Sequence, residues 1–202
     1  MMQQVSLQDV KPEPWRNGGG RTQELCVWPG SGVSGSVAPW QLRAWQLRIS
    51  VAQIDRDGPF SAFPGVQRWF AVLQGNGVNL SFGDQVQRLN SQSEAFCFDG
   101  ALAPGCSLVD GPTQDLNLML RAEAGQGGMQ RVQPAIAFAS TAPLRAIFSL
   151  DPLTLWVDGT AASSLPASTL ALDPQCRPTP WRVQAQGPQL RAWWMHFTPH
   201  RR

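Results

Sequence analysis

Hydrophobic and polar residues alternate along much of this chain in short runs, which is the pattern of half-buried β-strands. The clearest runs predict strands at residues 45–51, 68–73, 78–82, 116–121, 145–150 and 153–157. Glycine and proline, with 19 and 17 copies, separate these runs at short intervals. Many short strands with turn signals between them predict an all-β fold of the sandwich or barrel type.

The segments between these runs carry signals of their own. Gly75-Asn76-Gly77 lies between two apolar runs and predicts a hairpin turn. Residues 161–175 have room for a short helix, which Pro166 would limit. Residues 121–134, rich in Gly and Gln, are the expected linker between two halves. The pentapeptide QLRAW at 41–45 recurs at 189–193, by chance or as equivalent strands of two similar units.

Composition narrows the class of protein. Hydrophobic residues make up 43% of the chain, enough for a full core, and a net charge of +2 with no long basic run argues against nucleic-acid binding. No apolar stretch approaches the roughly 20 residues that span a membrane. The four cysteines show no CxxC spacing and no signal peptide precedes them, so we expect reduced thiols in a cytoplasmic protein.

The segment WRNGGGRTQEL at residues 15–25 combines three consecutive glycines with the start of a strand. Such a glycine run marks a turn with positive φ or a close approach of the backbone to another group. In the strand that follows, alternation places Thr22, Glu24 and Cys26 on one face. Two interpretations stay open: the wall of a binding site, or a glycine-rich loop before an edge strand.

Polar residues also line up on the other predicted strands. Arg48 and Ser50 share one strand face, and Asp115, Asn117 and Arg121 form a row on another. Such rows occur on the wet face of a sheet, yet arginine, asparagine and aspartate among apolar residues also suit the lining of a pocket. From these residues alone, a buried ion pair between Arg48 and Asp115 is the favoured explanation.

The spacing of residues 58–75 resembles that of the first cupin motif, in which a His-x-His pair and a later glutamate bind a metal ion. On that pattern Ser61 and Phe63 occupy the histidine places and Arg68 the glutamate place. A cation there would repel a metal ion and attract an anion. We therefore expect no metal and no cofactor, and we expect His196 and His200 to be strand-end or surface residues.

Taken together, these segments resemble the HutD/Ves family of cupin-like proteins. The resemblance covers roughly residues 14–123 and rests on motifs at 15–24, 47–50, 57–68, 73–77, 98–100 and 110–121. It implies an all-β bicupin of two RmlC-type jelly-roll barrels with few short helices, divided into halves 1–123 and 124–202. It also implies a poorly defined activity linked to histidine utilisation or stress. Trp69 and Leu120 depart from the family pattern and are expected to alter the selectivity of the pocket.

The leading hypothesis is a metal-free bicupin that binds a small carboxylated metabolite in a regulatory or buffering role. Three arginines are the candidate anion holders, because a guanidinium grips a carboxylate through two hydrogen bonds. The remaining members supply neutral donors and acceptors, orienting carboxylates and an aromatic wall, to which Trp15 also contributes. The candidate ligand-binding residues are Asn17, Thr22, Glu24, Arg48, Ser50, Ser61, Phe63, Arg68, Asp115, Asn117 and Arg121.

Two other classes of function stay open. One is a metal-independent isomerase or hydrolase with Glu24 or Asp115 as general base, which a strongly raised carboxylate pKa would support. The other is a protein-interaction scaffold whose tryptophan-rich surface docks a partner, and homodimer formation is included in this expectation. Light scattering tests the dimer.

Overall fold

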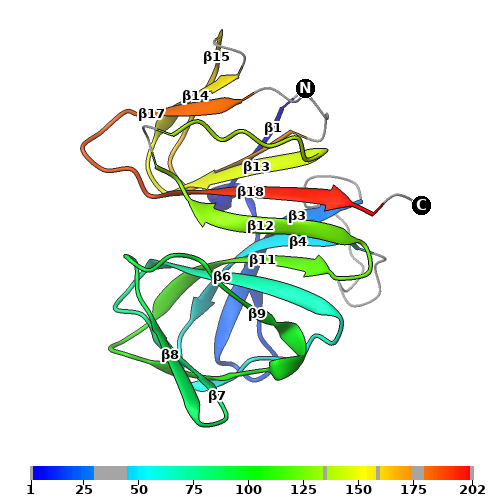
Figure 1. Ribbon diagram of the computed structural model, residues 1–202. Coiled ribbons are helices and arrows are strands. Elements are labelled where there is room, and N and C mark those ends of the chain that lie inside the picture. Colours follow the sequence, from blue (N-terminus) through cyan, green and yellow to red (C-terminus); the bar gives the residue numbers. More distant parts are fainter. Residues whose placement is uncertain (1, 30–44, 134–135, 158–159, 174–179, 201–202) are drawn as a thin grey trace. The chain divides into compact units, whose positions relative to one another are not determined.

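The computed structural model describes residues 2–29, 45–133, 136–157, 160–173 and 180–200. Across these residues the chain is almost entirely β-structure (Figure 1), and helical segments are confined to 3-10 turns at Leu7–Asp9 (η1) and Gly100–Leu102 (η3). The predicted all-β fold is confirmed.

The part of the chain described above contains no helix with the length and apolar character needed to cross a membrane.

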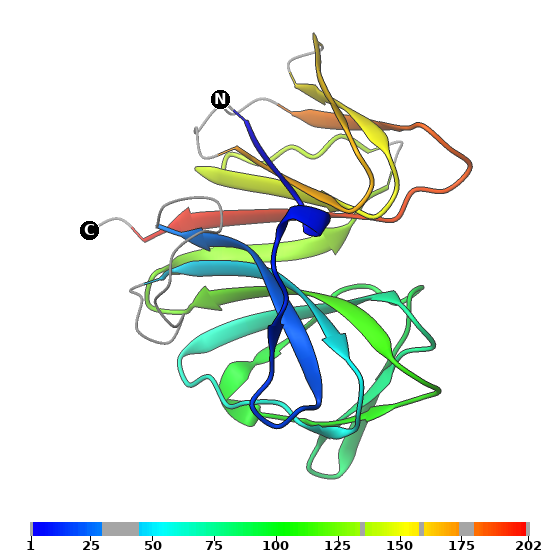
Figure 2. The ribbon, with the colours of Figure 1, turned by 180° about the vertical axis from the view of Figure 1, so that it is seen from behind.

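The chain divides into two compact units, one formed by Val10–Gly125 and the other by Met1–Asp9 together with Gln126–Arg202. The expected halves, 1–123 and 124–202, assign the first nine residues differently. The reason is that β1 (Gln3–Ser6) pairs antiparallel with β16 (Thr169–Asp173), with Val5 opposite Leu170. Figure 2 shows β1 in dark blue, leading into η1.

The unit Val10–Gly125 contains a six-stranded sheet in the order β2-β3-β4-β11-β6-β9 and a four-stranded sheet in the order β5-β10-β7-β8. The strands of the larger sheet are β2 (Glu13–Pro14), β3 (Gly20–Trp28), β4 (Leu47–Ile54), β6 (Val66–Gln74), β9 (Phe96–Asp99) and β11 (Thr113–Arg121). Those of the smaller sheet are β5 (Gly58–Pro59), β7 (Val78–Phe82), β8 (Gln85–Leu89) and β10 (Gly105–Leu108).

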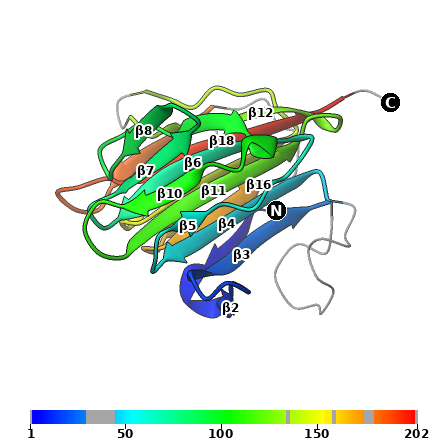
Figure 3. The same ribbon diagram turned by 90° about the horizontal axis from the view of Figure 1, so that it is seen from below.

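Figure 3 shows the smaller sheet of this unit in front of the larger one. Apolar side chains from both sheets pack between them, among them Phe70 and Val72 from β6 and Val78, Leu80 and Cys106 from β7 and β10. The larger sheet therefore directs one of its faces into the interior of its own unit.

The predicted hairpin at Gly75-Asn76-Gly77 is wrong. β6 pairs with β11 and β9, whereas β7 pairs with β8 and β10, so the turn carries the chain from one sheet to the other. Gly75 and Gly77 have φ of 92° and 101°, and a Cβ at Gly77 would lie 2.1 Å from the Leu89 carbonyl oxygen. Glycine is needed here because the chain passes close to other backbone as it moves from one sheet to the other. The tight hairpin joins β7 to β8, where Phe82 pairs with Gln85 across Gly83-Asp84.

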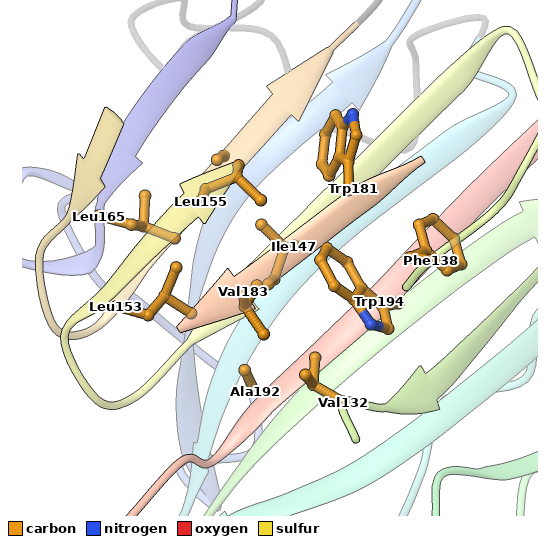
Figure 4. Close-up of a cluster of buried hydrophobic side chains, with 11 residues drawn as sticks. Val132, Phe138, Ile147, Leu153, Leu155, Leu165, Trp181, Val183, Ala192 and Trp194 are labelled. Atoms are coloured by element: carbon orange, nitrogen blue, oxygen red, sulfur yellow. The ribbon is translucent and has the colours of Figure 1, made fainter. Parts of the chain in front are cut away.

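The other unit contains a five-stranded sheet in the order β1-β16-β13-β18-β12 and a three-stranded sheet in the order β15-β14-β17. The further strands are β12 (Gly125–Arg131), β13 (Leu144–Ser149), β14 (Leu153–Val157), β15 (Thr160–Leu165), β17 (Trp181–Ala185) and β18 (Ala192–Pro199). Its core, shown in Figure 4, packs Trp181 edge-on against Trp194 with ring centroids 5.9 Å apart, and Phe138 stacks on Trp194 at 4.8 Å.

The expected helix in this unit is wrong. Residues 161–175 hold no helix where the structure describes them, since β15 and β16 pair with neighbouring strands on either side of Pro166. The expected linker at 121–134 does contain the division between the two units, after Gly125, but it also contains β12, which lies beside β18 in the five-stranded sheet. Both segments form strands because they pair with distant strands, and local composition does not show which strands pair. Residues 41–44 of the repeated pentapeptide lie outside the described residues.

Tryptophan is a core residue in this protein. Among the described tryptophans, Trp45, Trp69, Trp181, Trp193 and Trp194 are buried, and the others are half-buried. The exposed large hydrophobic side chains in the same ranges are Val86, Leu102 and Ile136. The tryptophan-rich surface expected for a docking scaffold is therefore not present on the described part of the chain.

Candidate functional site

The predicted polar rows meet on the inner face of the six-stranded sheet. Asn117 on β11 lies opposite Ser50 on β4 and Phe70 on β6, and Met119 lies opposite Arg48 and Arg68. Directly paired residues point to the same side of a sheet. Phe70 belongs to the core between the two sheets, so the polar residues beside it face the same interior. We call Glu24, Arg48, Ser50, Arg68, Asp115 and Asn117 the interior polar cluster.

Regular pairing of β3 with β4 brings Glu24 into this cluster, and a β-bulge follows it. Glu24 pairs with Ser50, but the next pair is Cys26 with Ile49, so Leu25 is the extra residue. The bulge reverses the alternation of β3, and Cys26 therefore lies on the face opposite to Glu24. The expectation that Thr22, Glu24 and Cys26 share one face holds for the first two only.

At the centre of the cluster, Asn117 links an arginine to a carboxylate. Arg68 donates from Nη2 to Asn117 Oδ1 over 2.8 Å, and Asn117 Nδ2 donates to Asp115 Oδ1 in a short hydrogen bond. Arg68 and Asp115 are 7% and 1% exposed. The amide of Asn117 thus separates a buried cation from a buried carboxyl group.

Three aromatic rings surround the Arg68 guanidinium. Its Cζ lies 5.0 Å from the ring centroid of Phe60, 5.2 Å from that of Phe98 and 5.6 Å from that of Phe63. Cation–π attraction of this kind offsets part of the cost of burying the charge. The rings also hold the guanidinium plane in one place, which favours directional recognition of a planar group.

Burial changes the pKa values of Arg68 and Asp115, the two ionisable groups that Asn117 links. Burial raises the pKa of Asp115 to about 8, although Arg68 and the Asn117 hydrogen bond act in the opposite direction. Burial also lowers the pKa of Arg68 to about 10, with Asp115 opposing this change and Arg48 adding to it. Asp115 therefore titrates near neutral pH while Arg68 stays charged.

Two buried polar atoms of this pair have no hydrogen-bond partner within the described residues. They are Nε of Arg68, a donor, and Oδ2 of Asp115. A buried polar group without a partner is rare in folded proteins and costs about 1–3 kcal/mol. The interior therefore offers the Arg68 Nε–H donor and the Asp115 Oδ2 atom to a molecule that can form hydrogen bonds with both.

The second arginine is held by a different partner. Arg48 donates from Nε to Glu24 Oε2 over 3.0 Å and from Nη1 to Met119 Sδ over 3.6 Å. The side chains of Arg48 and Glu24 are 10% and 25% exposed, so this ion pair lies at the edge of the interior. The ion pair expected between Arg48 and Asp115 is replaced by this one, because β3 brings Glu24 to β4.

The remaining sequence-predicted residues lie around the cluster or away from it. Thr22 accepts a hydrogen bond from the Trp15 indole over 2.7 Å, which ties the start of β3 to β2. Asn17 is an exposed turn residue whose side chain accepts from Gly19 N. Ser61 is exposed. Arg121 donates to the Trp45 carbonyl oxygen and its guanidinium lies over the Trp45 ring.

Sequence reasoning missed several residues of the site. Phe60 and Phe98 flank Arg68, and the thiol of Cys106 on β10 faces the cluster from the smaller sheet, where burial and the nearby Asp115 raise its pKa to about 12. Phe60 and Phe98 were visible as motif residues, but their contact with Arg68 depends on the packing of two sheets. Trp69 and Leu120, which were expected to alter selectivity, lie opposite Leu118 and Gln67, on the face of the sheet away from Arg68.

No group of three or more His, Cys, Asp or Glu side chains in the described ranges is placed to hold a metal ion.

Comparison with known proteins identifies the family of this chain. A family model described as HutD matches residues 7–188. An uncharacterized 21.2 kDa protein in the hutC 3' region of Pseudomonas putida is 37% identical over 118 residues, covering 58% of this chain and 57% of that protein. Protein Ves of Escherichia fergusonii is 31% identical over 117 residues, 56% of each chain. The alignments thus span little more than half the length of these curated relatives.

Solved structures extend the likeness to the whole fold. HutD from Pseudomonas fluorescens SBW25, solved in a formate condition, aligns with a TM-score of 0.82 at 27% identity over 100% of both chains. An oxalate decarboxylase from Lactobacillus farciminis, in a formate complex, aligns with a TM-score of 0.62 at 10% identity over 98% of this chain and 86% of that one. The second likeness shows the fold alone, which is cupin-like. With the family model matching most of its length, this chain belongs to the HutD family.

Proposed function

We propose that this protein binds a small carboxylated metabolite in the interior of the unit Val10–Gly125. The observation that carries the proposal is the pair of buried atoms without partners, Arg68 Nε and Asp115 Oδ2, on either side of Asn117. A ligand carboxylate accepts from Arg68 Nε, and a polar group of the same ligand forms a hydrogen bond with Asp115 Oδ2. Such a ligand satisfies both atoms at once.

The family gives this ligand a metabolic setting. Relatives carry the names HutD and Ves, and one is placed in a hutC 3' region, which supports a role in histidine utilisation. We propose that the protein senses or buffers a carboxylated intermediate of that process in the cytoplasm. We also propose that each unit is a jelly-roll barrel of the RmlC type, metal-free, with the described site inside the first.

A thermal-shift screen tests the proposal. Urocanate, formylglutamate, formiminoglutamate, histidine and glutamate are compared as ligands of the intact protein, with divalent metals in parallel. A ligand at 100 times its Kd stabilises by about 2.7 kcal/mol, which raises the Tm by several degrees. We expect one of the carboxylates to do so.

The matched variants are Arg68→Gln and Arg88→Gln. Arg88 is exposed on β8, so its loss leaves the shift unchanged, whereas Arg68→Gln abolishes it. A shift that survives Arg68→Gln contradicts the assignment of this arginine. No shift with any carboxylate contradicts the proposal itself.

A second candidate function is a metal-independent isomerase or hydrolase. The pKa of Asp115, about 8, is the observation that favours it, since a general acid–base group works best when its pKa lies near the working pH. Incubating each stabilising ligand with the protein and following it by NMR separates the two. Turnover that is lost in Asp115→Asn while the thermal shift is retained identifies an enzyme; an unchanged ligand identifies a binding protein.

A further inference from the structure

We propose that the other unit, formed by Met1–Asp9 and Gln126–Arg202, holds a second site that binds a small carboxylate beside Arg145, Trp181 and His196. This inference does not rest on the function proposed above, because it concerns different residues in a different unit.

A row of polar residues crosses the five-stranded sheet at this site. Arg145 on β13 lies directly opposite Asp173 on β16 and His196 on β18. Two residues further along β13, Ile147 lies opposite Trp194, and both belong to the apolar core of the unit. Residues two apart on a strand share a face. Arg145, Asp173 and His196 therefore face the same interior as that core.

Arg145 is a fully buried cation. It is 0% exposed, its Nη2 lies 3.3 Å from Asp173 Oδ2, and its Cζ lies 4.9 Å from the ring centroid of Trp181 on the facing sheet. A buried charge needs a partner and further hydrogen bonds to offset its loss of hydration. Asp173 supplies the balancing charge, and Trp181 supplies the ring, so the guanidinium is fixed in place before a ligand arrives.

Trp181 supplies the group that points to a ligand. Its side chain is 0% exposed and its Nε1–H has no hydrogen-bond partner among the described residues. In Figure 4 this nitrogen points away from the apolar cluster that the rest of the ring contacts. An indole N–H is a donor only, and it lies on the ring that the guanidinium covers. Two neighbouring donors select an oxygen acceptor, and a carboxylate offers two.

His196 adds a third polar group at the other end of the row. Burial lowers its pKa, so at neutral pH the imidazole is uncharged and keeps one N–H donor. The chain leaves room for the ring at Gly128, where a Cβ would lie 3.0 Å from His196 Cε1. With Arg145 as its only cation and Asp173 already opposing it, the row suits a singly charged carboxylate better than a phosphate.

The test follows the indole N–H signals of the intact protein by NMR during titration with acetate. The Arg68→Gln variant is used as background, so that the site in the other unit does not contribute. The signal of Trp181 is assigned by its loss in Trp181→Phe, which keeps an aromatic ring and removes the donor. We expect this signal to move downfield and saturate, and Trp181→Phe to weaken acetate binding at least about tenfold.

Three results overturn the proposal. One is a Trp181 signal that stays fixed through the acetate titration of the folded Arg68→Gln protein, a measurement that needs no change at Trp181. Another is acetate binding of equal strength in the Arg68→Gln and Arg68→Gln/Trp181→Phe proteins. Inorganic phosphate is the comparison probe, and an equal response to phosphate contradicts the assignment to carboxylates. Because the titration is run in the Arg68→Gln protein, its result does not depend on the site in the unit Val10–Gly125, and the two proposals can fail separately.

Discussion

At the scale of single residues, this protein is distinguished by charged groups placed inside apolar surroundings. The Arg68 guanidinium lies among three phenylalanine rings, and Asp115 accepts a hydrogen bond from the amide of Asn117, which in turn accepts one from Arg68. Each charge in the interior would be costly alone, and each is compensated only in part. Incomplete compensation, rather than the presence of the charges, is what marks the interior polar cluster as a candidate site.

The pH dependence of folding tests the state of Asp115. Its pKa in the folded protein, about 8, lies above its ordinary value of 3.8, so the folded state binds more protons than the unfolded state between these values. Stability contributed by this group therefore falls as the pH rises from about 4 to about 8. Asp115→Asn removes that fall, which is on the order of several kcal/mol, in urea titrations over this range.

The matched control for this measurement is Asp84→Asn, in the exposed turn between β7 and β8. Its stability should follow the wild-type curve. A parallel curve for Asp115→Asn would show that Asp115 is ionised in the folded protein well below pH 7.

Arg48 separates a binding role from a structural one. Arg48→Ala removes the ion pair with Glu24, which is partly exposed, so we expect a loss of stability of only about 1–2 kcal/mol. Ligand binding should weaken far more, by at least about tenfold, if Arg48 helps hold the carboxylate. The control is Arg21→Ala, which breaks the exposed pair with Asp55. Urea denaturation measures the stability of both variants, and ligand titration measures their binding. Equal losses of stability and of binding in Arg48→Ala would show that the role of Arg48 is structural.

At the scale of elements, irregular backbone shapes strand β3. The bulge at Leu25 places Glu24 and Cys26 on opposite faces, and the glycine run that ends at the start of β3 allows a close approach to β4. A Cβ at Gly20 would lie 2.1 Å from the Gln53 carbonyl oxygen and 3.1 Å from the Trp15 ring. The predicted close approach is therefore met at Gly20, and at Gly18 the chain has a φ of 67°. The two expected reasons for a glycine run, a positive φ and a close approach of the backbone, therefore both occur between Gly18 and Gly20.

Gly20→Ala tests the close approach. Because the obstructing atom belongs to the backbone of a paired strand, we expect a destabilisation of at least about 2 kcal/mol in urea unfolding. Gly58→Ala on β5 is the matched control, since a Cβ there meets nothing within 4 Å. Similar unfolding midpoints for the two variants would mean that β3 and β4 separate at little cost.

At the scale of the whole molecule, the chain passes from one unit to the other twice, after Asp9 and after Gly125. Residues before Val10 complete a sheet whose other strands lie between residues 125 and 199. The early strand β1 forms one edge of that sheet by pairing with β16. Contacts of such long sequence separation are set by the fold and not by local propensity.

Hydrogen exchange measures the dependence of this sheet on β1. Val5 is 7% exposed, whereas its neighbour Gln4 is exposed. Val5→Asp places a charge in the core and should accelerate amide exchange in β16 at least about tenfold, because the edge pairing opens more often. Gln4→Asp introduces the same charge outside and should leave β16 unchanged. Equal exchange rates in the two variants would show that β16 does not need β1.

The sequence by itself determined the all-β class, the approximate positions of six strands, the polar rows and the family. These features depend on period-two alternation and on motif residues, which are local. It did not determine that Gly75-Asn76-Gly77 joins two sheets, that residues 121–134 contain a strand, or that Glu24 replaces Asp115 as the partner of Arg48. Those features depend on which strands pair and in which register, and both are decided when distant segments meet. The unpartnered atoms of Arg68, Asp115 and Trp181 belong to the same class, because only the packed interior removes water from them.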